Sequence, residues 1–183
     1  MSVQRLRRED CVLLIIDVQE AFVPSLYDPY PTIKNILKLS QGADVLGIPI
    51  ILTEQYPKGI GETVPHILDR LGTHSYVEKD TFSCFKEPRF VEQLGETGKS
   101  QIIITGIEAH VCVTKTALDA IDAGYEVYVV DDAVTSRTKR NRDLGVRRME
   151  RAGAVVESTE SALFACIERS DDETFKQIHR IIK

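Results

Sequence analysis

The stretch Gln101-Ile-Ile-Ile-Thr-Gly-Ile-Glu-Ala-His-Val-Cys112-Val runs from an apolar strand through a glycine to a thiol. Residues 113–123 place apolar side chains at helical spacing, and Gly124 is a natural helix stop. We therefore expect Cys112 to be the first residue of a helix, where the peptide dipoles lower a thiol pKa below its usual value of about 8.5. Because free cysteines are also often buried as small apolar residues, a structural role stays open.

Short apolar runs alternate with helical patterns along the rest of the chain. Strands are expected at 12–16, 48–53, 75–78, 101–105, 126–130 and 154–157, and helices at 32–46, 88–97, 113–123, 140–152, 161–169 and 172–182. Most of the strands are apolar throughout, which predicts that both of their faces are buried. The pattern is typical of a three-layer α/β/α fold of Rossmann-like type, with an open, six-stranded, mostly parallel sheet. The irregular stretch 54–73 is too long for a simple connection, so we expect it to be an active-site loop.

Composition narrows the class of protein. The chain has 183 residues, of which 43% are hydrophobic, so we expect residues 1–183 to form a single domain with a real core. No apolar run reaches the length of about 20 residues that a bilayer requires, and the N-terminus lacks the apolar region of a signal peptide. We expect a cytoplasmic protein without a membrane partner. The net charge of −5 and the mixed charge pattern do not favour nucleic acid as a partner.

Polar side chains stand where three of the expected strands end. Asp17 follows the strand at 12–16, Lys79 follows the strand at 75–78, and Cys112 follows the strand at 101–105. Ligands of open parallel sheets bind outside the carboxyl ends of the strands, so we expect these side chains to share one site. A thiol, a carboxylate and an ammonium group together suit a nucleophile with its base and a stabilising cation. Alternatively, Asp17 caps a helix or forms a lone ion pair, and Lys79 is a solvated surface lysine.

Three motifs resemble one known family. These are Leu14-Ile-Ile-Asp17-Val-Gln19, Val77-Glu-Lys-Asp-Thr-Phe-Ser83 and Thr105-Gly-Ile-Glu-Ala-His-Val-Cys112-Val. In this order, at the strand ends, they are similar to the isochorismatase-like cysteine hydrolases. Thr53-Glu-Gln-Tyr-Pro-Lys-Gly and Phe175-Lys-Gln-Ile-His resemble the branch called isochorismatase domain-containing proteins.

The resemblance implies a catalytic triad of Asp17, Lys79 and Cys112. Asp17 would take the thiol proton, Lys79 would stabilise the thiolate and hold Asp17, and Cys112 would attack a small amide or related C–N substrate to form a thioester-type intermediate. The family's non-proline cis peptide falls on the Ile107–Glu108 bond, and the backbone N–H groups of Glu108 and Cys112 are the expected oxyanion donors.

Other residues near these motifs are expected to bind the substrate. They are Gln19, Phe22, Glu54, Tyr56, Phe82 and His110, although a lone histidine such as His110 more often makes a structural hydrogen bond. Nicotinamidases of the family carry an Asp-x-His metal motif after strand two, where this chain has Glu54-Gln55-Tyr56-Pro57. We therefore expect neither a catalytic metal nor another cofactor.

Two other functions stay open. One is a non-catalytic binding or interaction protein that keeps the fold and the thiol, and the other is an isochorismatase-type vinyl-ether hydrolase that needs no nucleophilic cysteine. The family tendency to oligomerise also implies a homo-oligomer, a dimer or larger. The charged and hydroxyl side chains of 131–137, with the helix beginning near Arg140, are the interface that we expect.

Overall fold

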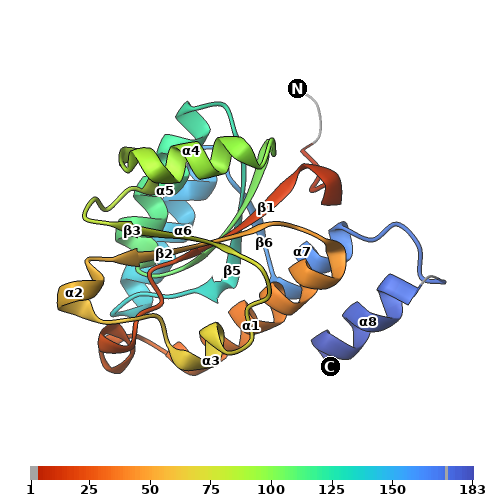
Figure 1. The fold of residues 1–183 in the computed structure, drawn as a ribbon, viewed down its shortest axis with the longest axis horizontal. Coiled ribbons are helices and arrows are strands. Elements are labelled where there is room, and N and C mark those ends of the chain that lie inside the picture. Colours follow the sequence, from red (N-terminus) through yellow and green to blue (C-terminus); the bar gives the residue numbers. More distant parts are fainter. Residues whose placement is uncertain (1–3, 172) are drawn as a thin grey trace.

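A single sheet organises the chain (Figure 1). The computed structural model describes residues 4–171 and 173–183. The strands lie in the order β3-β2-β1-β4-β5-β6, and neighbouring strands pair in parallel. Their bounds are β1 Cys11–Ile16, β2 Ile50–Gln55, β3 Ser75–Lys79, β4 Gln101–Gly106, β5 Glu126–Val134 and β6 Val155–Glu157. The expectation of an open, six-stranded α/β sheet is confirmed, and the sheet is parallel throughout.

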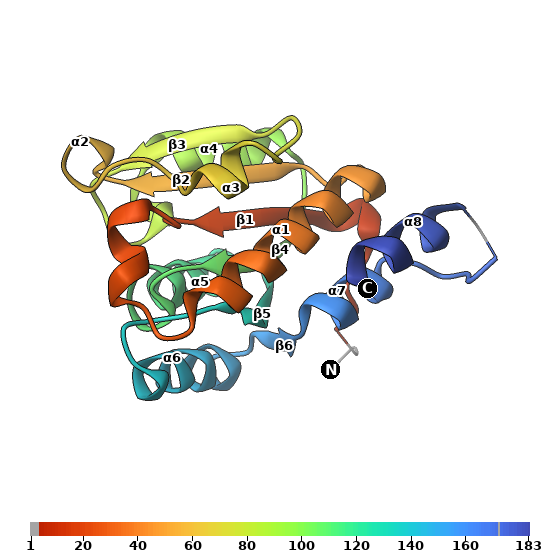
Figure 2. The same ribbon diagram turned by 90° about the horizontal axis from the view of Figure 1, so that it is seen from below.

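Helices cover both faces of this sheet (Figures 1 and 2). One face carries α1 Pro29–Leu46, α3 Pro65–Leu68, α7 Thr159–Ala165 and α8 Glu173–Ile182, and the other carries α4 Pro88–Glu96, α5 Thr114–Asp122 and α6 Lys139–Arg151. Shorter turns are η1 Arg8–Asp10, η2 Glu20–Ser25, α2 Pro57–Ile60, η3 Cys84–Lys86 and the π-helical turn η4 Ala109–Val113. Within the described ranges, no helix has the length and apolar character that crossing a bilayer requires.

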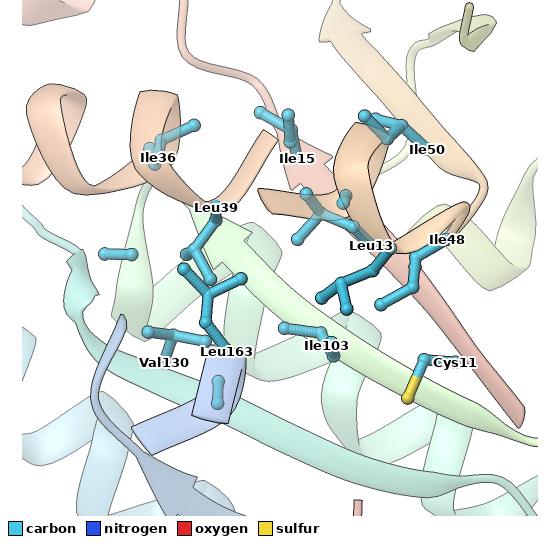
Figure 3. Close-up of a cluster of buried hydrophobic side chains, with 14 of the residues drawn as sticks. Cys11, Leu13, Ile15, Ile36, Leu39, Ile48, Ile50, Ile103, Val130 and Leu163 are labelled. Atoms are coloured by element: carbon cyan, nitrogen blue, oxygen red, sulfur yellow. The ribbon is translucent and has the colours of Figure 1, made fainter. Parts of the chain in front are cut away.

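The central strand β1 shows why the sheet has two buried faces. Side chains alternate along a strand, so Cys11, Leu13 and Ile15 pack toward α1 while Val12, Leu14 and Ile16 pack toward α4 and α5. Figure 3 shows the first set against Ile36 and Leu39 of α1 and Leu163 of α7. All six residues of β1 are at most 1% exposed. Because every residue of β1 is buried, the strand is fixed in the core, and so is the position of Asp17 at its end.

Several element bounds differ from the sequence expectation. The stretch 54–73 contains α2 and α3, and an antiparallel bridge between Gln19 and Thr63 ties it to the chain that leaves β1. Helix α7 begins two residues earlier than expected because Ser158 and Ser161 form a capping box, and it ends at Ala165. The expected start of the last helix, residue 172, lies outside the described residues.

Strand β5 runs four residues beyond its expected end at residue 130. Its extra length includes Asp131 and Asp132, which β propensity alone does not favour. Asp131 pairs with Arg142 of α6, and Asp132 accepts hydrogen bonds from the N–H and hydroxyl of Thr159, each at 2.8 Å. The ion pair and the hydrogen bonds from distant residues therefore stabilise the two carboxylates within the strand.

Candidate active site

The site lies where the order of the strands reverses. From β1 the chain proceeds to β2 and β3 on one side, and from β4 to β5 and β6 on the other. In open parallel sheets, ligands bind at the carboxyl ends of the two strands at such a reversal, which here are β1 and β4. A pocket of about 480 Å³ occupies that position. Its polar lining consists of Asp17, Gln55, Asp80, Glu108 and Cys112, and its apolar lining of Phe22, Tyr56, Ile60, Phe82, Ile107 and Val111.

Asp17 and Lys79 form a buried ion pair at the floor of this pocket. Lys79 Nζ donates to Asp17 Oδ2 at 2.6 Å, and the two side chains are 0% and 1% exposed. The same Nζ donates to Gln55 Oε1 at 2.7 Å and to the Thr81 carbonyl at 3.2 Å, so its three protons have three acceptors. Thr53 Oγ1 donates to Asp17 Oδ1 at 2.7 Å. Both ions are thus compensated, as buried charges require.

Burial changes the acid–base character of this pair. Desolvation raises the pKa of Asp17 above its usual range, opposed by the Lys79 ammonium group and by the Thr53 hydrogen bond. For Lys79, desolvation alone would lower the pKa, but the Asp17 carboxylate reverses the direction and holds the pKa above its usual value. Asp17 is therefore a stronger base than an exposed aspartate, while Lys79 stays charged.

Asp17 also has an unusual backbone. Its φ is 53°, in the left-handed region that non-glycine residues seldom adopt. Residues held there cluster at functional sites. Gly106 ends the neighbouring strand β4 with a φ of 111°, and a Cβ at this position would collide with the backbone of Ile16. The glycine therefore lets the two strand ends approach closely and brings the segment of Cys112 beside Asp17.

The position of Cys112 corrects the expected helix start. Helical structure begins three residues earlier, in the π turn η4, and Thr114 begins α5. Gly145 of α6 packs against this turn, since a Cβ there would lie 2.6 Å from the Ala109 carbonyl oxygen. Cys112 is therefore inside a helical segment, 7% exposed, with its side chain on the pocket.

The expected lowering of the Cys112 pKa is wrong. Burial raises the pKa of this thiol well above its usual value, the Asp17 carboxylate raises it further, and only Lys79 opposes the change. The interaction between the thiol and Asp17 also favours the protonated sulfur. A resting cysteine in this site is consequently a neutral thiol beside a carboxylate of raised pKa.

A second thiol lies under the same network. Cys84 is fully buried, and desolvation followed by the Asp17 charge raises its pKa to about 12. Its backbone N–H donates to Thr116 Oγ1 at 3.0 Å. Cys84 does not line the pocket, so it acts as packing behind Lys79 and Cys112.

The Ile107–Glu108 peptide bond is cis, at the position that the resemblance implied. Both residues line the pocket. The Glu108 side chain accepts a hydrogen bond from Arg137 Nε at 2.9 Å, which turns its carboxylate toward the exposed guanidinium group. The backbone before Cys112 thus forms one wall of the pocket.

A sequence model of the isochorismatase domain matches residues 11–161. The chain belongs to the isochorismatase family. Isochorismatase domain-containing protein 2 of Danio rerio is 35% identical over 184 residues, covering 99% of this chain and 91% of that protein. Two solved structures share the fold. The MAR1 ribonuclease of Caenorhabditis elegans is 34% identical with a TM-score of 0.92, covering 98% of this chain and 92% of that one. The YcaC gene product of Escherichia coli, described as an octameric hydrolase of unknown specificity, is 26% identical with a TM-score of 0.93, covering 100% and 91%.

Three of the six side chains expected to bind substrate line the pocket of this isochorismatase-family member, namely Phe22, Tyr56 and Phe82. The other three are engaged elsewhere. Gln19 is fully buried and bonds the backbone of Gln55 at 2.8 and 3.0 Å. Glu54 accepts from the Thr63 N–H at 2.5 Å and from the Tyr76 hydroxyl at 2.6 Å. His110 contacts Ser136 Oγ at 3.0 Å. These three side chains therefore stabilise neighbouring segments through hydrogen bonds and do not line the pocket.

Gln55 is the pocket residue that the sequence argument missed beside Glu54. Thr53 and Gln55 point to the same side of β2 and reach Asp17 and Lys79, whereas Glu54 points to the other side. The two-residue alternation of a strand was the signal that would have found it. Asp80, Ile60 and Val111 also line the pocket without having been expected.

The interface expected at 131–137 uses its polar groups within the chain. Thr135 Oγ1 donates to the Tyr27 carbonyl at 2.5 Å, and the Ser136 carbonyl accepts from the Tyr27 N–H at 2.8 Å. Asp131 and Asp132 likewise have partners within the chain, Arg142 and Thr159, so the location of the interface stays a prediction. In the part of the chain that the structure describes, no three His, Cys, Asp or Glu side chains are grouped so as to hold a metal ion.

Proposed function

We propose that this family member is a metal-independent cysteine hydrolase that acts on a small amide or related C–N substrate. One observation carries the proposal: Cys112 and Asp17 interact at the wall of one pocket, and Lys79 pairs with Asp17 at 2.6 Å behind them. Burial of two ions costs desolvation free energy that their attraction does not always offset, so a buried ion pair indicates a functional role. Here it places a base of raised pKa beside a neutral thiol.

In the first step the sulfur attacks the carbonyl carbon as Asp17 accepts the thiol proton. A C–S bond forms, the C–N bond breaks, and the proton passes from Asp17 to the leaving amine. The negative charge moves from the Asp17 carboxylate to the sulfur and the oxyanion, and the Lys79 ammonium group stabilises it electrostatically. The backbone N–H groups of Glu108 and Cys112 are the proposed donors to the oxyanion.

In the second step water attacks the thioester with Asp17 again as base. The C–S bond breaks, the carboxylic acid leaves, and the proton returns to the sulfur. Asp17, Lys79 and Cys112 are the proposed catalytic residues, and Thr53 positions Asp17 by its 2.7 Å hydrogen bond.

A screen of small amides with wild type and Cys112→Ala tests this function, read by amine release and by intact mass. We expect turnover and an acyl adduct with wild type only. Equal turnover by Cys112→Ala would mean that amide hydrolysis proceeds without a covalent intermediate on Cys112. Absence of turnover and of any adduct would favour the non-catalytic binding protein instead.

We also propose that residues 1–183 act as one hydrolase domain that assembles into a homo-oligomer, a dimer or larger. The octameric E. coli relative supports the assembly. Light scattering that shows a 20.6 kDa monomer at micromolar concentration would contradict it. Free thiols at Cys11, Cys84, Cys112 and Cys166 support a reducing location, for which we propose the cytoplasm.

A further inference from the structure

The charged groups around the pocket are asymmetric. Asp17, Asp80 and Glu108 line it, and no lysine, arginine or histidine is among its lining residues. Asp17 is paired with Lys79, and Glu108 with Arg137, whose side chain is 60% exposed and does not line the pocket. Asp80 is exposed and has no ion pair in the described part of the chain. The uncompensated charge at the pocket is therefore negative.

Two cations near the pocket already have partners, and the exposed Lys58 lies with Asp80 in the adjoining pocket but not in this lining. Lys79 Nζ is directed to Asp17, Gln55 and Thr81, so a substrate carboxylate could reach it only by displacing one of them. Lys115 Nζ lies over the Phe82 ring, 5.0 Å from its centroid. An anion among the lining residues would thus lose water without a cationic side chain of the lining to replace it, which is unfavourable.

The remaining lining suits apolar or cationic groups. Phe22, Tyr56 and Phe82 present aromatic surface, and Tyr56 and Phe82 are each 53% exposed. Aromatic faces attract cations as well as apolar groups. Asp80 follows Lys79 directly and adds a carboxylate beside these rings.

We infer that the pocket takes uncharged or cationic amides, that it discriminates against carboxylate- and phosphate-bearing substrates, and that Asp80 contributes most to this preference. The inference rests on the proposed function, since it names the substrate class of the same site. It predicts that RNA, a polyanion, is a poor ligand of this pocket, because the lining carries carboxylates and no cationic side chain.

Two thiol reagents of opposite charge test the preference without a known substrate. The probes are 2-(trimethylammonium)ethyl and 2-sulfonatoethyl methanethiosulfonate, each of which forms a mixed disulfide with the thiolate and releases methanesulfinate. Rates at Cys112 are followed by peptide mass mapping and divided by the rates with 2-mercaptoethanol. Because one sulfur reacts with both probes, its thiolate fraction cancels in the ratio.

We expect a normalised cationic-to-anionic ratio of about tenfold at low ionic strength, decreasing as salt is added. Asp80→Asn should reduce the ratio by about threefold. Asp69→Asn is the matched control, because Asp69 is exposed and does not line the pocket, and it should leave the ratio unchanged. Cys166 is an internal control, since Arg7, Arg8 and Arg169 line its pocket, and it should show no cationic preference.

A ratio at or below one for Cys112, or no effect of Asp80→Asn, would overturn the inference while leaving the cysteine hydrolase intact. If neither reagent labels Cys112, the thiol stays protonated in the resting enzyme, in line with its raised pKa. The preference is then read from the melting temperature with benzylammonium, benzamide and benzoate at equal concentration. Benzoate should stabilise least, and stabilisation by benzoate equal to or above that by benzylammonium would overturn it.

Discussion

The two ends of β1 both carry buried reactive groups, but their surroundings differ. At its start, Cys11 donates to the Arg7 carbonyl at 2.8 Å and interacts with the Cys166 thiol. At its end, Asp17 joins Lys79 and faces Cys112. The first group is a pair of thiols with neutral hydrogen-bond acceptors, and the second is an ion pair that shares a pocket with a thiol.

The difference indicates what distinguishes a catalytic cysteine from a buried structural one. Cys11, whose pKa is raised above its usual value, is buried at low cost, because a neutral thiol behaves as a small apolar group. At the other end, two ions are desolvated, and a buried ion pair is rarely a net source of stability. Charge retained at such a cost beside a thiol indicates function, and the following experiments test that contrast.

The largest expected effect separates the two sulfurs directly. Cys112→Ala should lower kcat on an amide substrate by at least about 10³-fold, because loss of a nucleophile removes covalent catalysis. Cys166→Ala is the control at the other end of β1 and should leave kcat unchanged. Steady-state kinetics with both variants checks this, and equal losses would mean that the contrast is one of packing alone.

Lys79→Met breaks the ion pair and leaves the Asp17 carboxylate buried alone. We expect kcat to fall by about 10²-fold or more and the free energy of unfolding to fall by about 3–5 kcal/mol. Urea denaturation and kinetics measure the two effects. Lys86→Met makes the same change in an exposed pair, 3.5 Å from Asp119, and should change stability by less than about 1 kcal/mol. Similar losses in both variants would contradict a special role for Lys79.

Asp17→Asn should change the two activities of Cys112 in opposite directions. Removal of the carboxylate leaves Lys79 unopposed, so the pKa of Cys112 falls from its raised value and more thiolate exists at neutral pH. Alkylation by iodoacetamide at pH 7 should become about tenfold faster, while kcat falls by about 10²-fold. The pH profile of alkylation gives the sign: half-maximal reaction moves to lower pH in the variant. A shift to higher pH would exclude Asp17 as the group that holds the proton on sulfur.

The smallest effect concerns the hydroxyl that positions Asp17. Thr53→Val removes a 2.7 Å hydrogen bond to the carboxylate, and a bond to a charged group is worth about 1.5–3 kcal/mol. We expect kcat to fall by about tenfold with little change in KM. Thr105→Val is the matched control, because Thr105 is equally buried but donates to the Leu14 carbonyl at 3.1 Å. A similar loss of kcat in the control would reduce Thr53 to a packing role.

The strand ends were predictable from sequence because their causes are local. Apolar runs such as that before Asp17 define buried strands, and parallel strands end at one edge, so Asp17, Lys79 and Cys112 could be expected near one another. The α/β fold followed from the same alternation. Ser158 and Ser161, which form the capping box, stand three residues apart, a spacing that marks the start of α7.

Side-chain direction and acid–base state were decided by the tertiary structure. Glu54 and Gln55 are neighbours, yet only Gln55 reaches Lys79, because the pleat and the contacts with Thr63 and Tyr76 turn Glu54 away. The Cys112 pKa was expected to fall from the helix dipole, a local effect. Burial and the facing Asp17 carboxylate raise it instead, since interactions between charges brought together by folding in a low-dielectric pocket outweigh those within one helix turn.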